Sequence, residues 1–481
     1  MLSAVEIAAA IRAGKTTAVE QLETAFARVD ALNPRLNAVI WQDREGAFAT
    51  ARACDEETAR GQSRGPLHGV PITVKESFDL AGSPTTWGIP ELRDNIRHVD
   101  SDAVARYRAA GGIVYGKTNV PLKLVEWQSF NEIYGSTSNP WDLSRTSGGS
   151  SGGSGVSVAT GMAALEAGSD IGSSIRNPAH YNGVCGLKPT WNVVSKKGHT
   201  MEGWYGDVDI AVAGPLARTA EDLTLAFEVL AGPGPFDASQ WALNLPPDPR
   251  EKLADFTVAL KLGDASAPVD QAYLDALSAF ADQLEAAGAR VIRDRLPQIE
   301  SEPHFMLYLK LLGAAMSIGM SDADAAAAVA PYADAPEDVK RIGGTRMSGT
   351  QISHREWLTL DNRRRAARLA FEAFFEEVDV IIAPVASSAA FPKDEVGLRA
   401  FRRFPVNNVN QLENTQLFWS GYSGVVGIPS VVGPMAQLGG LPVGYQAICG
   451  HGRDHTCLAF ARAVEREIVG YVPPPICAGL A

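Results

Sequence analysis

Two turns rich in glycine and serine are the parts of this sequence best suited to chemistry. They read S-R-T-S-G-G-S-S-G-G-S-G over residues 144–155 and G-S-D-I-G-S-S-I-R-N-P-A over residues 168–179. Such sequence often forms flexible linkers, but here it leads directly into an apolar segment, Val156 to Ala167, that reads as a helix. Glycines in this setting let the backbone approach a partner closely, and consecutive free N–H groups can bind an anion. We therefore expect a site at these turns.

The two turns, taken with Lys75 in G-V-P-I-T-V-K-E, resemble the amidase signature family of serine hydrolases. The spacing of Lys75, Ser150 and Ser174 is also similar to that of family members. The match continues through three further segments, G-L-K-P-T at 186–190, V-A-G-P-L-A-R-T-A-E-D-L at 212–223 and L-P-V-G-Y-Q at 441–446. The resemblance therefore covers most of the chain.

The resemblance implies a role for each catalytic side chain. Ser174 would be the nucleophile, Ser150 the bridging serine that relays protons, and Lys75 the base at the end of the relay. The lysine must be neutral to accept a proton, and burial shifts a lysine pKa in the required direction. The resemblance also implies a cis peptide bond between Gly149 and Ser150. Attack on the substrate would form an acyl-enzyme on Ser174, which water then hydrolyses.

The resemblance also assigns the residues around the nucleophile. Four backbone N–H groups would form the oxyanion hole, those of Ile171, Gly172, Ser173 and Ser174. Ser151 and Arg176 fall on positions that support the triad. Most family members have glycine where this chain has Ser173, which puts in doubt a backbone conformation with positive φ there. We expect this serine to modify substrate choice without removing activity.

The expected activity is hydrolysis of the C–N bond of a carboxylic amide, and esters, anilides and carbamates are open as further substrates. The resemblance implies no metal and no organic cofactor. The partners would be a small-molecule amide and water, and a homodimer is compatible with the sequence. Six aromatic residues could line a pocket, although core packing is the commoner reason for such residues: Trp87, Trp127, Trp204, Tyr205, Phe418 and Trp419.

The family also contains an alternative function, the glutaminase subunit of tRNA-dependent amidotransferases, which releases ammonia for a partner. The serine turn of those subunits typically has threonine, glycine and glycine where this chain has Ile171, Gly172 and Ser173. The sequence therefore favours a free-standing hydrolase.

A second alternative is a serine esterase similar to the α/β-hydrolases. G-G-S-S-G-G contains the nucleophile-elbow pattern G-x-S-x-G twice, centred on Ser150 and on Ser151. Such an enzyme needs a histidine later in the chain, and six are available: His180, His199, His304, His354, His451 and His455. It also needs an apolar strand before the elbow, and S-T-S-N-P-W-D-L-S-R-T is not one.

Composition excludes several classes of partner. The formal charge of −12 argues against binding to nucleic acid or an anionic membrane. The five cysteines are scattered without C-x-x-C spacing, so neither a disulfide framework nor a zinc site is indicated. The N-terminus lacks a secretion signal and no apolar run is long enough to span a membrane, so we expect a cytoplasmic protein.

The elements that must position the turns read as alternating strands and helices. Lys75 ends an apolar run that begins at Leu67, and the helix Asp102 to Ala110 and a further apolar run follow it. The resemblance implies one α/β domain over 1–481, with a mixed central β-sheet sandwiched between α-helical layers. We divide it into N-terminal helices (1–64), a core with the catalytic residues (65–235), a mainly helical segment that could cap the active site (301–377), and C-terminal strands with a closing helix (378–481).

Overall fold

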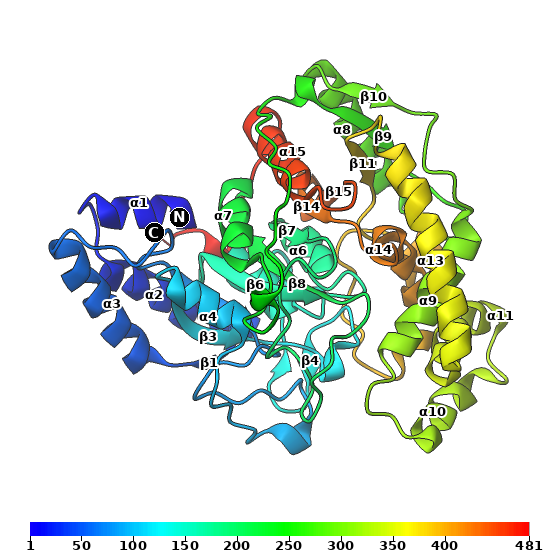
Figure 1. Cartoon of the computed structure of the whole chain (residues 1–481), viewed down its shortest axis with the longest axis horizontal. Helices are drawn as coiled ribbons and strands as arrows, with labels where there is room; N and C mark the ends of the chain where they lie inside the picture. The colour runs from blue at the N-terminus through cyan, green and yellow to red at the C-terminus, as the bar shows by residue number, and fades with distance from the viewer. Residues whose placement is uncertain (481) are drawn as a thin grey trace.

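One continuous sheet of eleven strands runs through the molecule (Figure 1). The computed structural model describes residues 1–480. In spatial order the strands are β1 (Val39–Gln42), β3 (Ile113–Thr118), β2 (Pro71–Lys75), β6 (Leu165–Asp170), β8 (Val212–Ala217), β7 (Cys185–Lys188), β14 (Ser430–Leu438), β15 (Leu441–Ile448), β11 (Val380–Ala383), β9 (Thr257–Leu260) and β10 (Arg290–Ile292). The sheet is mixed, because β2 runs parallel to β3 and β6 whereas β8 runs antiparallel to β6 and β7. The expectation of a single α/β domain with a mixed sheet is confirmed.

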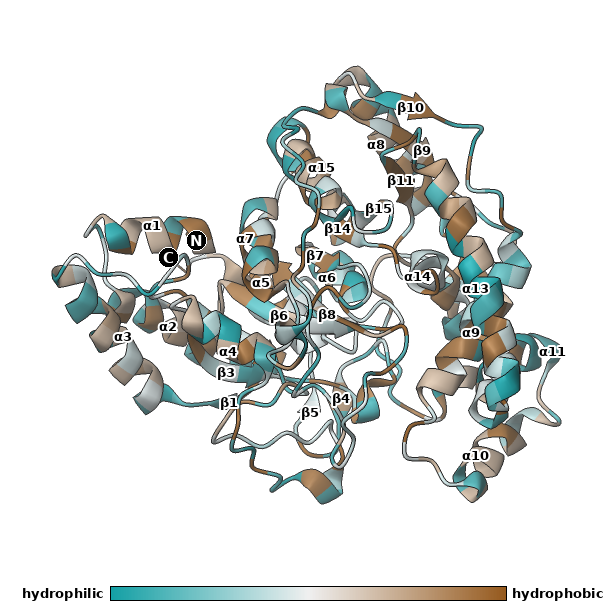
Figure 2. Cartoon of the chain, in the orientation of Figure 1, coloured by the Kyte–Doolittle hydropathy of each residue, from teal (hydrophilic) through white to brown (hydrophobic). Residues whose placement is uncertain are grey.

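Helices pack around this sheet. The N-terminal helices are α1 (Ala4–Arg12), α2 (Ala18–Leu36) and α3 (Arg44–Ala59), and the core adds α4 (Asp102–Ala109), α5 (Gly152–Ala159), α6 (Arg176–Asn182) and α7 (Ala220–Leu230). The later helices are α8 (Gln271–Ala286), α9 (Ser301–Ala315), α10 (Asp322–Val329), α13 (His354–Phe374), α14 (Leu417–Gly424) and α15 (Asp454–Glu467). Figure 2 shows hydrophobic strands β9 and β11 beside α13, whose surface alternates between polar and apolar residues.

The first two N-terminal helices each begin with a capping box. Ser3 and Thr17 accept hydrogen bonds from the backbone of Glu6 and Glu20, whose side chains return the bond to each cap. This reciprocal pair satisfies N–H groups that a helix start leaves without partners. The apolar faces of these helices pack into the core, and Leu22, for example, is fully buried.

The segment between the two serine turns differs from the prediction. A helix was expected over 156–167, but α5 ends at Ala159 and β6 begins at Leu165. The chain reverses at Gly161, whose φ is +70°. β6 pairs with β2 along one edge and β8 along the other. All of its residues are buried, so it lacks the alternation that identifies a half-exposed strand.

The segment 301–377 is mainly helical, as the sequence predicts, and α9 and α13 lie side by side at one flank of the molecule (Figure 1). The closing helix α15 begins at Asp454 and contains His455. His451 precedes this helix, so the two histidines do not lie on one helix face. No helix within residues 1–480 is long and apolar enough to cross a bilayer.

Candidate active site

Lys75 occupies the last position of β2, a strand with buried neighbours on both sides. Its side chain is fully buried, and its Nζ donates hydrogen bonds to Ser150 Oγ at 2.7 Å and to Ser169 Oγ at 2.8 Å. Burial lowers the pKa of Lys75 to about 7, while the charges of Asp170 and Glu166 act in the opposite direction. A lysine in this environment is neutral in a large fraction of molecules near neutral pH.

The turn that carries Ser150 is fixed by backbone contacts and by one amide side chain. The peptide bond Gly149–Ser150 is cis, as the resemblance implies. Asn177 of α6 donates to Gly149 O at 2.6 Å and accepts from Gly149 N at 3.0 Å. A Cβ on Gly149 would stand 2.4 Å from Glu126 O, so only glycine fits. The predicted sites did not include Asn177, although N-P-A follows the second turn directly.

Ser151 and Ser169 connect the two turns. Ser151 N donates to Ser174 O at 3.2 Å, and Ser151 Oγ donates to Ser169 O at 3.4 Å. Ser169 Oγ is one of the two acceptors of Lys75. Ser151 therefore makes direct contacts with the turn that it is predicted to support. Ser169 also belongs to the site, and the prediction does not include it although it stands in the second turn.

Asp170 organises the turn around Ser174. Its carboxylate accepts from the backbone N–H groups of Ser173 at 2.8 Å, Ile175 at 3.1 Å and Arg176 at 3.3 Å. The Arg176 side chain adds two bonds to the same carboxylate, and both side chains are fully buried. Burial alone would raise the pKa of Asp170, but Arg176 and the N–H donors hold it below its usual value. Arg176 is thus a buried support of the turn.

The backbone of the turn is oriented by two side chains from outside it. Tyr308 of α9 donates its hydroxyl to Ile171 O at 2.9 Å, and Trp127 Nε1 donates to Gly172 O at 2.7 Å. Both contacts fix the orientation of peptide groups that precede Ser174 in the turn. The N–H groups of Ile171, Gly172 and Ser174 donate to no protein group within residues 1–480.

Ser173 departs from the prediction in two ways. Its N–H donates to Asp170, so one of the four N–H groups predicted for the oxyanion hole already has a protein acceptor. Its φ is +77°, the left-handed region that strains a residue with a Cβ. The Ser173 hydroxyl is buried, has no hydrogen-bond partner and does not line the pocket. The hypothesis that Ser173 modifies substrate choice stays a prediction.

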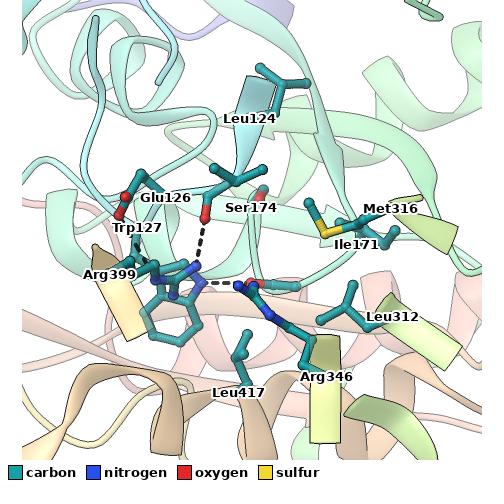
Figure 3. A pocket seen from close by; sticks show the side chains of 12 residues that line it. Leu124, Glu126, Trp127, Ile171, Ser174, Leu312, Met316, Arg346, Arg399 and Leu417 are labelled. Atoms are coloured by element: carbon teal, nitrogen blue, oxygen red, sulfur yellow. Dashed lines mark hydrogen bonds and ion pairs between the residues drawn. The ribbon is translucent and has the colours of Figure 1, made fainter. Parts of the chain in front are cut away.

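Ser174 lines a narrow pocket at the surface of this turn (Figure 3). The pocket has a volume of about 20 Å³, room for water but not for a substrate, so the lining side chains must move apart on binding. Its lining comprises Leu124, Val125, Glu126, Trp127, Ile171, Gly172, Ser174, Leu312, Met316, Arg346, Arg399 and Leu417. No hydrogen bond joins the hydroxyls of Ser150 and Ser174 in the described part of the chain. Of the six aromatic residues singled out from the sequence, only Trp127 belongs to this lining.

One cluster away from the pocket has metal-ligand chemistry. The ligand atoms of Cys54, Glu57 and His68 lie within 4.8 Å of one another. However, Glu57 accepts two hydrogen bonds from the Arg64 side chain, and His68 Nδ1 accepts from Arg64 N at 3.1 Å. These atoms already have protein partners, so the cluster is explained as a structural contact.

The histidines do not form the catalytic arrangement that the α/β-hydrolase alternative needs. His180 contacts Ser388 O and the backbone N–H of Gly444, and His304 contacts Tyr422 O. Among residues 1–480 no histidine is hydrogen-bonded to Ser150 or Ser151. These contacts do not support the α/β-hydrolase alternative, and the group bonded to Ser150 is a lysine.

The fold is a mixed eleven-stranded sheet. It buries Lys75 against Ser150, and Ser174 lies in a pocket beside N–H groups that have no protein acceptor among the described residues. The amidase family model matches residues 20–458. The chain belongs to the amidase signature family and is an amide hydrolase.

Relatives and solved structures agree with this assignment. The indoleacetamide hydrolase of Bradyrhizobium diazoefficiens is 34% identical over 97% of this chain and 86% of its own length. A glutamyl-tRNA(Gln) amidotransferase subunit from Streptomyces avermitilis is 32% identical over 82% of each chain. The crystal structure of an amidase is 27% identical, covers 97% of this chain and 99% of its own, and superposes with a TM-score of 0.77.

Proposed function

We propose that this enzyme hydrolyses a carboxylic amide through an acyl-enzyme on Ser174, with Ser150 relaying protons to neutral Lys75. The observation that carries this proposal is the 2.7 Å contact between the buried Lys75 Nζ and Ser150 Oγ. A buried amine without a carboxylate in contact is suited to accept a proton at neutral pH.

The first step forms a bond between Ser174 Oγ and the amide carbon. The Ser174 proton passes to Ser150 Oγ as the Ser150 proton passes to Lys75 Nζ, which becomes an ammonium group. The carbonyl oxygen gains the negative charge. Ile171, Gly172 and Ser174 offer the unpartnered N–H groups for it, and Trp127 and Tyr308 keep the intervening carbonyl groups out of the way.

The second step breaks the C–N bond and regenerates the base. Ser150 donates a proton to the leaving nitrogen and recovers one from Lys75, so the amine leaves neutral. Water then attacks the acyl group through the same relay in reverse, which releases the carboxylic acid and restores the Ser174 hydroxyl. The proton count closes because Lys75 gains and loses one proton in each half of the cycle.

Covalent labelling tests this assignment. We expect a fluorophosphonate to label the purified chain at Ser174, mapped by peptide mass spectrometry, and labelling to be lost in Ser174→Ala and strongly slowed in Lys75→Ala. Lys117→Ala is a matched control, because Lys117 is another buried lysine that contacts Pro84 O and Thr85 and no serine of the site. Labelling at Ser150 or Ser151 that survives Lys75→Ala would contradict the proposal.

A second candidate function is the glutaminase component of an amidotransferase. The match to the Streptomyces amidotransferase protein over 82% of both chains favours it, whereas Ile171 and Ser173 in the serine turn favour the free-standing enzyme. Amide hydrolysis by the purified chain without any partner would support the free-standing enzyme. Glutamine hydrolysis that appears only when a partner complex is added would support the amidotransferase component.

A further inference from the structure

The pocket beside Ser174 carries more positive charge than the neighbouring carboxylates balance. Three guanidinium groups share two carboxylates there. Arg399 Nε donates to Glu413 Oε1 at 2.8 Å, and Arg402 Nη1 donates to Glu126 Oε2 at 2.7 Å. Arg346 has no carboxylate within ion-pair distance in the part of the chain that the structure describes.

Two donors of these arginines are buried without an acceptor. Arg399 is 8% exposed, and after its bonds to Glu413 and to Val125 O its Nη2 has no partner. Arg346 Nε is also buried and without a partner. Figure 3 shows both side chains reaching into the pocket with their guanidinium groups turned toward each other. Buried charged donors are rarely left unpaired in proteins, so these two donors are available to an acceptor that enters the pocket.

The surroundings make Arg346 dependent on that acceptor. Burial lowers its pKa, and the charge of Arg399 lowers it further. The Tyr332 hydroxyl is its polar neighbour and brings no negative charge. Glu126 is near enough to act on Arg346 but is already paired with Arg402. An anion entering the pocket would therefore complete the charge balance.

We propose that the substrate is an amide that also carries a carboxylate, and that Arg346 and Arg399 bind this carboxylate. A carboxylate offers two coplanar oxygens, the geometry that guanidinium groups bind best. The apolar walls formed by Leu312, Met316 and Leu417 suit a short methylene chain between the two groups. Because Ser174 lies in the same small pocket, the carboxylate must be only a few bonds from the scissile amide. The inference rests on the proposed function and narrows its substrate to half-amides of short dicarboxylic acids.

A matched pair of substrates tests the proposal on the full-length chain. Glutaramate and valeramide have the same five-carbon acyl chain and differ in a terminal carboxylate against a methyl group. We expect kcat/KM for glutaramate to exceed that for valeramide at least tenfold in the wild type. Arg346→Gln should lower this ratio by a factor of about ten to one hundred, and Arg346→Lys should give an intermediate ratio.

The control variant is Arg341→Gln. Arg341 belongs to the same helical segment but pairs with Glu302 and lies outside the pocket. We expect it to keep the wild-type ratio. A wild-type ratio near one, or equal ratios in wild type and Arg346→Gln, would overturn the proposal.

A second measurement separates failure of this inference from failure of the proposed function. The rate of fluorophosphonate labelling at Ser174 is measured with glutarate and with sodium chloride at equal ionic strength. We expect glutarate to slow labelling in the wild type and to have at least tenfold less effect in Arg346→Gln. Labelling that glutarate does not slow would overturn the carboxylate site while the nucleophile stands. No labelling of Ser174 at all would remove the proposed function and this inference with it.

Discussion

Contact with a serine, and not a shifted pKa alone, distinguishes Lys75 from the other buried lysines. Burial lowers the pKa of Lys75 to about 7, but it also lowers the pKa of Lys188 to about 7 and of Lys117 to about 8. Lys188 donates to a backbone carbonyl, that of Pro189, whereas Lys75 meets the hydroxyls of Ser150 and Ser169. Only the second kind of contact gives a neutral amine a proton to accept.

The pKa of Lys75 predicts the pH dependence of hydrolysis. The neutral amine is the active form, so kcat/KM should rise with pH through an inflection near 7 and level off above it. Rates measured from pH 5 to 9 with one neutral amide would show this. Lys75→Arg should lose activity at every pH in this range, because a guanidinium group does not deprotonate there. A flat profile in the wild type would contradict the assignment of Lys75 as the base.

Ser173 should reduce stability through its backbone conformation. A non-glycine residue in the left-handed region costs about 1–3 kcal/mol of backbone strain, which Ser173→Gly would remove. Glycine also has more freedom in the unfolded chain, so we expect a net rise of about 1 kcal/mol in the free energy of unfolding. Ser173→Ala keeps the positive φ and serves as the control, with a smaller gain. Urea unfolding measures both. Relative rates over a set of amides, taken on the same variants, test whether this residue also modifies substrate choice.

At the scale of elements, the nucleophile turn between β6 and α6 is shaped by parts of the chain that lie far apart in the sequence. Asp170 at the end of β6 holds three N–H groups, Tyr308 comes from α9, and Trp127 comes from the loop before the first serine turn. The helical segment predicted as a cap also supplies Leu312, Met316 and Arg346 to the pocket. The oxyanion geometry therefore depends on how α9 packs against the core.

Removal of the Tyr308 hydroxyl tests this dependence. Tyr308→Phe should lower kcat roughly three- to tenfold, because one hydrogen bond of about 0.5–1.5 kcal/mol orients the Ile171 peptide group, and should change KM little. Tyr471→Phe is the control, since its hydroxyl donates to Ala159 O, outside the pocket. Each variant should lose about 1 kcal/mol of unfolding free energy, but only Tyr308→Phe should lose activity. Equal kcat values for the two variants would mean that Tyr308 is only a packing contact.

At the scale of the whole molecule, the sheet and one arginine join the two halves of the chain. β7 pairs with β14, so the sheet continues from the catalytic core into the C-terminal strands. Arg176, beside the nucleophile, donates to Ser420 O, Ser423 Oγ and Gln446 Oε1 as well as to Asp170. We therefore expect that residues 65–235 do not fold as a separate unit.

A fragment tests this unity. Residues 65–235 expressed alone should fail to show a cooperative urea transition or labelling at Ser174. The cause would be that β7 becomes an open sheet edge and that Arg176 loses its acceptors from the C-terminal part. The full chain, treated identically, is the control. A fragment with its own cooperative transition would show that 65–235 is an independent domain.

The sequence by itself determined the family and the fold class, because the family motifs and the alternation of strands with helices are local patterns. It failed at β6, where burial on both faces removes the alternation by which a strand is identified. Tertiary structure alone decided what surrounds the catalytic groups. Contacts between distant segments give Arg176 its partners and bring Tyr308 and Trp127 to the carbonyl groups of the turn. They also set the left-handed conformation of Ser173 and leave Arg346 without a carboxylate partner. No local pattern encodes such contacts, since they form only when the sheet brings its two halves together.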